Sequence, residues 1–147
     1  ESHGYAEESI FRKLASCVDH FFLDVKHMDS EIHREVVGVS NDKILKNIQM
    51  LAEEYRCDVS LRMPFIPGFN DTKENIILFG EFAKRIKEKG HLTMVHLLPY
   101  HNLGKSKYQA LARTYEMDSV AVPDNSTMEY WKGVLETQFD IPVTIGG

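Results

Sequence analysis

The chain has 147 residues, 43% of them hydrophobic and 27% charged, and its formal net charge is −5. This length fits one domain, residues 1–147, with an ordinary core. The acidic balance argues against broad nucleic-acid binding, and no apolar run approaches the roughly 18 to 20 residues of a membrane span. No signal peptide is visible at the start. We therefore expect a cytoplasmic protein with neither nucleic acid nor membrane as a partner.

The two cysteines, Cys17 and Cys57, lie far apart in the sequence, and neither belongs to a Cys-x-x-Cys pair. We expect two free thiols, as is usual in a cytosolic protein. An iron–sulfur cluster usually needs three or four thiolates. The sequence therefore predicts that this chain contains no iron–sulfur ligands.

The first part of the chain predicts a helix, a strand and two further helices. Apolar residues recur at helical spacing at the start, namely Ile10, Phe11, Leu14 and Val18. Residues 20–26 then form a strand. Asp29 caps a short helix, and Ser40 or Asn41 caps a second one. The apolar face of that second helix carries Ile44, Leu45, Ile48, Leu51 and Tyr55.

The rest of the chain continues the alternation of strands and helices. Residues 58–65 predict a strand, and Asp71 with Glu74 resembles a capping box at the start of a helix that ends at Gly90. A third strand covers residues 93–98. A last helix carries Met128, Trp131, Leu135 and Phe139, and residues 142–145 form a final short strand.

This alternation predicts an α/β fold with parallel strands and right-handed crossovers. One face of the strands is apolar, whereas the other carries Asp24, Lys26, Ser60, Arg62 and His96. A sheet covered on both faces is apolar on both, and a closed barrel fills its interior with branched side chains. We therefore predict the C-terminal portion of an open, partial TIM-like (βα) barrel, whose hollow holds a polar ligand.

Polar residues gather toward the carboxyl ends of the strands, where ligands bind in parallel α/β folds. Asp24 and Lys26 point the same way, Arg62 is their counterpart on the next strand, and His101 follows the third strand. A ligand carboxylate could pair with Lys26 or Arg62, and a hydroxyl with Asp24 or His101. The alternative is a structural salt-bridge network of Asp24, Lys26 and Arg62 beside a histidine without a role.

Four segments together resemble one family. The first is residues 22–29, which contain a D-x-K motif, together with residues 38–41. The second is Arg62 with residues 67–71, and the third is residues 97–101 with 103–105 and 107–108. The fourth is the start of the chain, residues 1–5. In order and spacing these segments resemble the C-terminal part of glycyl-radical-enzyme activating enzymes. The resemblance is to the pyruvate formate-lyase activating type, in the radical S-adenosylmethionine superfamily.

The resemblance implies a set of roles. Lys26 would contact the aminocarboxylate of S-adenosylmethionine with help from Asp24, while Arg62 and His101 would line its ribose and adenine side. Glu1 and Asp24 would lie near a monovalent cation. A [4Fe–4S] cluster would cleave S-adenosylmethionine reductively, using electrons from a flavodoxin- or ferredoxin-type donor. The resulting radical would take a glycine hydrogen from a partner such as pyruvate formate-lyase.

Two family elements are absent from this sequence, the C-x-x-x-C-x-x-C cluster motif and the Gly-Gly-Glu element that binds the amine. We therefore expect a partial radical-S-adenosylmethionine barrel that lacks the N-terminal cluster-binding segment, has no catalytic residue of its own and is inactive alone. Two alternatives stay open. One is a stand-alone ligand-binding or interaction module, and the other is a barrel lyase that uses Lys26 as a Schiff-base amine with Asp24 as its acid or base.

Overall fold

Four parallel strands form one sheet in the computed structural model, which describes residues 1–101 and 120–147. The strands follow one another in the order β1-β2-β3-β4. Their bounds are β1 (His20–Asp24), β2 (Asp58–Phe65), β3 (Leu92–Pro99) and β4 (Val143–Ile145). A sequential order of parallel strands is the wall of a (βα) barrel, so the predicted α/β class and partial barrel are confirmed.

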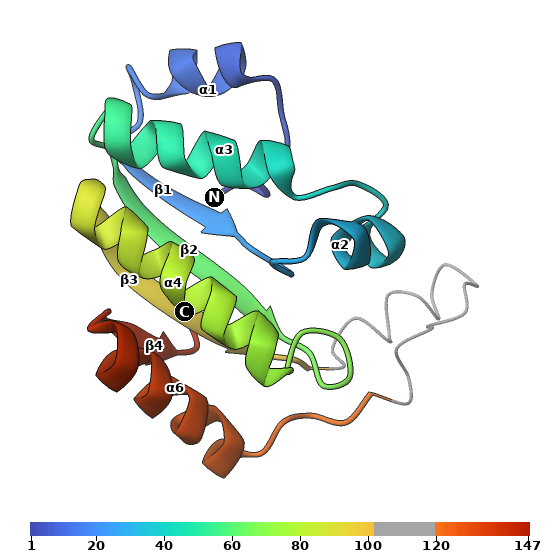
Figure 1. The fold of residues 1–147 in the computed structure, drawn as a ribbon. Helices are drawn as coiled ribbons and strands as arrows, with labels where there is room; N and C mark the ends of the chain where they lie inside the picture. The colour runs from blue at the N-terminus through green and yellow to red at the C-terminus, as the bar shows by residue number, and fades with distance from the viewer. Residues whose placement is uncertain (102–119) are drawn as a thin grey trace.

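The helices join these strands and cover one face of the sheet. Figure 1 shows α3, α4 and α6 lying across that face, whereas α2 lies beyond the end of β1. The bounds are α1 (Glu8–Leu14), α2 (Ser30–Val37), α3 (Asp42–Gln49), η1 (Met50–Glu54), α4 (Lys73–Lys89) and α6 (Asn125–Phe139). None of the helices in the described ranges is long and apolar enough to cross a membrane.

The two faces of the sheet differ as the sequence predicts. Leu23, Leu61, Val95 and Val143 stand in register across the four strands, and the first three are fully buried beneath the helices. Burying such a side chain contributes about 1.5–3 kcal/mol. The next row is Asp24, Arg62, His96 and Thr144, which are only partly buried. The sheet therefore has a packed outer face and a half-open, polar inner face.

The start of the chain extends this sheet beyond β1. The Ser2 amide donates to the carbonyl of Phe22 at 2.9 Å, and the Asp24 amide donates to the carbonyl of Ser2 at 3.3 Å. These two bonds make an isolated parallel bridge between Ser2 and Leu23. Glu1 is thereby placed beside the end of β1, next to the polar row.

Helix starts follow the predicted caps in part. Oδ1 of Asp29 accepts from the amides of Glu31 and Ile32 at 2.9 Å each, which confirms the cap of α2. The capping box at Asp71 is wrong, because Thr72 is the cap of α4 and Asp71 instead accepts from the amide of Gly68 in the preceding turn. Asn41 stands at the cap position of α3 but makes no side-chain cap bond.

Two predicted apolar stripes are shorter than expected. In α1 only Phe11 is buried; Ile10 is 50% exposed, and Val18 lies beyond the end of the helix. Tyr55 is exposed because η1 is a turn of π-helix, closed by a bond from the Tyr55 amide to the carbonyl of Met50. A π-turn holds more residues than an α-turn, so it rotates Tyr55 off the apolar face.

Candidate functional site

Arg62 and two carboxylates form the centre of the polar row. Nε and Nη2 of Arg62 lie 2.8 and 2.7 Å from Oδ1 of Asp24, and Nη2 lies 2.6 Å from Oε1 of Glu1. The Glu1 hydrogen bond, together with the Asp24 contacts, raises the pKa of the Arg62 guanidinium. The same guanidinium lowers the pKa of Glu1. The alternative of a structural network of Asp24, Lys26 and Arg62 is therefore met only in part: Asp24 and Arg62 are paired, Glu1 joins them, and no contact pairs Lys26 with Asp24.

The pairing of Glu1 and Asp24 with Arg62 affects the monovalent cation site expected at these two carboxylates. Their carboxylates converge on the Arg62 guanidinium, which already supplies positive charge between them. Within residues 1–101 and 120–147, no group of three or more His, Cys, Asp and Glu residues could hold a metal ion. The monovalent cation site stays a prediction.

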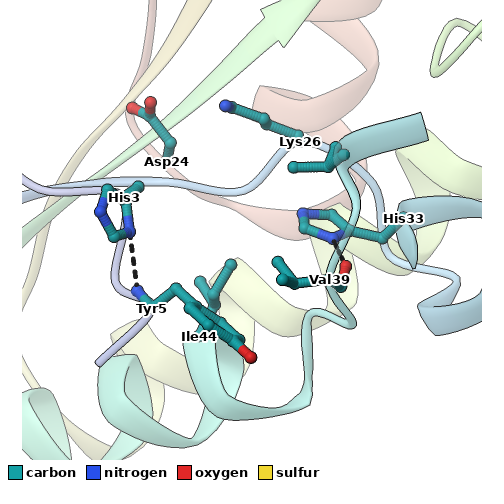
Figure 2. Close-up of a pocket in the computed structure, with 8 residues that line it drawn as sticks. His3, Tyr5, Asp24, Lys26, His33, Val39 and Ile44 are labelled. Carbon is teal, nitrogen blue, oxygen red and sulfur yellow. Dashed lines mark hydrogen bonds between the residues drawn. The ribbon is translucent and has the colours of Figure 1, made fainter. Parts of the chain in front are cut away.

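Lys26 stands outside this network and borders a cavity. Its ammonium has no hydrogen-bond or ion-pair partner among the residues that the structure describes. The cavity encloses about 260 Å³ at the end of β1 (Figure 2) and is lined by His3, Tyr5, Asp24, Lys26, His33, Val37, Val39 and Ile44. A cation at the edge of a largely apolar cavity is suited to the carboxylate of a ligand.

His33, which is not among the site residues predicted from the sequence, lines this cavity from α2 and is only 1% exposed. Its Nδ1 lies 2.6 Å from the carbonyl oxygen of Val39 (Figure 2). A carbonyl only accepts, so Nδ1 of His33 donates in this hydrogen bond. The one sequence signal for His33 is its position four residues after the Asp29 cap, one helical turn into α2.

A second hollow of about 340 Å³ lies on the inner face of the sheet. Its lining residues are Glu1, Phe22, Arg62, His96, Leu98 and Gly147. Nδ1 of His96 lies 3.2 Å from the carbonyl oxygen of Gly146, and its ring centroid is 5.8 Å from that of Phe22. Since Asp24 lines the first cavity and Arg62 the second, their ion pair links the two hollows.

His101 is exposed just beyond the carboxyl end of β3. The amide of the preceding Tyr100 donates to the carbonyl of Phe65, the last residue of β2, at 3.0 Å. His101 therefore lies at the same end of the sheet as Lys26. The predicted signature at residues 103–105 and 107–108 lies outside the described residues.

No protein-family model matches the chain, but comparison with curated proteins finds similar sequences. The 4-hydroxyphenylacetate decarboxylase activating enzyme of Clostridioides difficile (strain 630) is 38% identical over 130 residues, 88% of this chain and 40% of its own length. The pyruvate formate-lyase 1-activating enzyme of Escherichia coli (strain K12) is 36% identical over 129 residues, 88% of this chain and 51% of its own length. This chain is homologous to part of the glycyl-radical-enzyme activating enzymes. It spans about half or less of the length of these activating enzymes.

Two solved structures are similar to this chain. A domain of pyruvate-formate lyase-activating enzyme from Bacteroides vulgatus ATCC 8482 has a TM-score of 0.77 and 27% identity, over 97% of this chain and 76% of that one. A radical SAM methyltransferase from Sphaerobacter thermophilus has a TM-score of 0.65 at 14% identity, over 95% of this chain and 37% of that one. The second likeness shows the shared fold alone.

Proposed function

We propose that this chain is the part of a glycyl-radical-enzyme activating enzyme that holds S-adenosylmethionine. The observation that carries the proposal is Lys26, an ammonium without a partner among the described residues, at the edge of a cavity beside an ion-paired Asp24. A partnered Asp24 leaves Lys26 available to a ligand carboxylate. The homology to activating enzymes supports this choice of ligand.

Each predicted site residue has a role under this proposal. Lys26 binds the aminocarboxylate, and Asp24, fixed by Arg62, borders the same group. Arg62 lines the ribose and adenine side from the inner face of the sheet. His101 lines the same side from its exposed position after the end of β3. Glu1 and Asp24 lie beside a monovalent cation, whose binding requires Arg62 to share their carboxylates.

The residues present do not fit a [4Fe–4S] cluster. Cys17 is an exposed free thiol and Cys57 a buried one, and burial raises the pKa of the Cys57 thiol. Two separated cysteines fall short of the three or four thiolates that such a cluster requires. We infer that the cluster ligands belong to a segment outside residues 1–147, so that this chain is a partial radical-S-adenosylmethionine barrel.

The complete enzyme is then an oxidoreductase that places a glycyl radical on a partner enzyme. Bound S-adenosylmethionine supplies the radical chemistry, and this chain binds the molecule, orients it and limits access of water. The partner is a glycyl-radical enzyme such as pyruvate formate-lyase. The electron donor is of the flavodoxin or ferredoxin type, and the setting is cytoplasmic. The Schiff-base lyase has less support, because these two relatives are activating enzymes.

Two assays test this function. Residues 1–147 alone, given S-adenosylmethionine and dithionite, should release no 5′-deoxyadenosine.

The complete gene product should produce a glycyl-radical signal on its partner in electron paramagnetic resonance. Lys26→Ala or Asp24→Ala should reduce that signal strongly, whereas Arg34→Ala, on the exposed side of α2, should not. An undiminished signal in Lys26→Ala would refute the role of Lys26.

A further inference from the structure

Three buried asparagines surround the backbone that follows β1. Asn41, Asn70 and Asn75 are 2%, 0% and 2% exposed. They come from the start of α3, the loop after β2 and the first turn of α4. A buried amide is costly unless its donors and its acceptor are satisfied, so the groups that these side chains bind indicate why they are there.

Asn70 holds the carbonyl of Lys26. Its Nδ2 donates to the Lys26 carbonyl oxygen at 2.8 Å and to that of Pro64 at 2.5 Å, while its Oδ1 accepts from the amide of Ile66 at 2.8 Å. Asn70 therefore ties Lys26, whose ammonium has no partner among the described residues, to the end of β2. The last sheet bond of this segment lies one residue earlier, from the Val25 amide to the Arg62 carbonyl at 2.8 Å.

Asn75 and Asn41 hold the next two residues. Oδ1 of Asn75 accepts from the amide of Met28 at 2.8 Å, and its Nδ2 donates to the carbonyl of Asn70 at 2.9 Å. Nδ2 of Asn41 donates to the carbonyls of His27 and Met28 at 2.8 and 2.7 Å. This explains why Asn41, although at a cap position, makes no cap bond with its side chain.

We propose that Asn41, Asn70 and Asn75 are positioning residues for Lys26, which fix the backbone of residues 26–28 before any ligand arrives. The inference rests on the proposed function, in which Lys26 binds the carboxylate of S-adenosylmethionine. In residues 1–101 and 120–147, no backbone–backbone hydrogen bond holds Lys26 itself beyond the sheet bond of Val25. A long, flexible lysine binds a carboxylate more tightly when its backbone is already fixed, because less conformational entropy is lost on binding.

The first measurement is made without ligand, by hydrogen exchange of the Met28 amide. Asn70→Ser and Asn41→Ala should each accelerate this exchange at least about tenfold, because local opening of residues 26–28 becomes easier. The control is Leu135→Ala in α6, a fully buried site remote from this loop, which lowers global stability without touching the asparagines. Acceleration no greater than in Leu135→Ala would overturn the inference.

The second measurement compares two ligands by calorimetry. S-adenosylmethionine carries the carboxylate, and 5′-methylthioadenosine lacks it. Asn70→Ser and Asn41→Ala should weaken S-adenosylmethionine binding about tenfold, as expected when a binding group is displaced, and leave methylthioadenosine unchanged. In a Lys26→Met background, Asn70→Ser should have no further effect, because the group that it positions is gone.

The outcomes separate the two proposals. If Lys26→Met weakens S-adenosylmethionine binding but the asparagine variants do not, or if they weaken both ligands equally, the positioning role is overturned while the proposed function stands. If Lys26→Met has no effect, or the wild-type chain does not bind S-adenosylmethionine, the role of Lys26 in the proposed function is contradicted. In that case, hydrogen exchange of the Met28 amide in the asparagine variants is the measurement that tests whether these residues fix the backbone of residues 26–28.

Discussion

Arg62 is the residue that joins Glu1, β1 and β2 through charge. Its side chain is 14% exposed and that of Asp24 is 21% exposed, so their pairing is better shielded from water than the surface ion pairs of this chain. Removing the guanidinium would leave two neighbouring carboxylates without their shared partner. The residue therefore supports the fold as well as bordering the inner hollow.

We expect Arg62→Met to lower the free energy of unfolding by about 1–3 kcal/mol, because Asp24 loses a charged hydrogen-bond partner in a half-buried place. Urea denaturation measures this change. The matched control is Arg34→Met, which breaks an exposed pair with Glu31 and should cost less than about 1 kcal/mol. Equal effects of the two variants would contradict a structural role for Arg62.

His27 should make stability depend on pH. The ring is 5% exposed, its Nδ1 accepts from the amide of Asp29 at 3.0 Å, and burial lowers its pKa below the usual value of a histidine. The unfolded chain therefore binds a proton more readily than the folded one. Stability is complete above the unfolded pKa of about 6.5 and falls as pH decreases from there toward the folded pKa.

Replacing His27 with asparagine, which can still accept from the Asp29 amide, should flatten the decrease in unfolding free energy between about pH 7 and about pH 5. Urea denaturation across this range provides the measurement. His3→Asn is the matched control, because His3 is exposed and its Nδ1 likewise accepts from an amide two residues later, that of Tyr5. An unchanged slope in His27→Asn would show that burial of this ring is not responsible.

At the scale of elements, the packing of α4 against α6 depends on the absence of a side chain at Gly80. A methyl group there would overlap the ring of Phe139. Gly133, inside α6, has open space where its methyl group would be. The two glycines therefore offer a matched pair in which helix propensity is the same and only the packing differs.

Gly80→Ala should destabilise the chain by about 1–3 kcal/mol, because the overlap with Phe139 outweighs the gain in helix propensity. Gly133→Ala should stabilise it by about 0.5–1 kcal/mol, because only that gain remains. Thermal and urea unfolding of both variants provide the measurement. If both substitutions stabilised the chain, α4 and α6 would not be packed as described.

At the scale of the whole molecule, the alternation of apolar and polar residues was sufficient to predict the two faces of the sheet. Leu23 and Leu61 are buried, while Asp24 and Arg62 face the half-open side. This prediction holds because side-chain direction in a strand depends only on a period of two. The pairing of Arg62 with Glu1 follows instead from the path of the first residues beside β1, which periodicity does not encode.

The cavity beside Lys26 likewise could not be predicted from sequence periodicity. Its lining combines the start of the chain, the end of β1, α2 and α3, so the contributions of Tyr5 and His33 depend on how distant segments pack. The asparagines that hold residues 26–28 were equally hidden, because Asn41 resembles a helix cap in the sequence and Asn70 a turn residue. Motifs indicated which residues could bind a ligand, whereas packing determines which groups hold them.

S-adenosylmethionine is proposed to bind beside Lys26 and the ion pair of Asp24 with Arg62, and chemical-shift mapping tests this most directly. Titrating the ¹⁵N-labelled chain with S-adenosylmethionine should shift the amides of residues 24–28 and Arg62 most strongly. The amides around Arg12 and Lys46, which line a charged hollow on the helical side, should change little. Shifts concentrated around Arg12 and Lys46, or none at all near Lys26, would contradict the account.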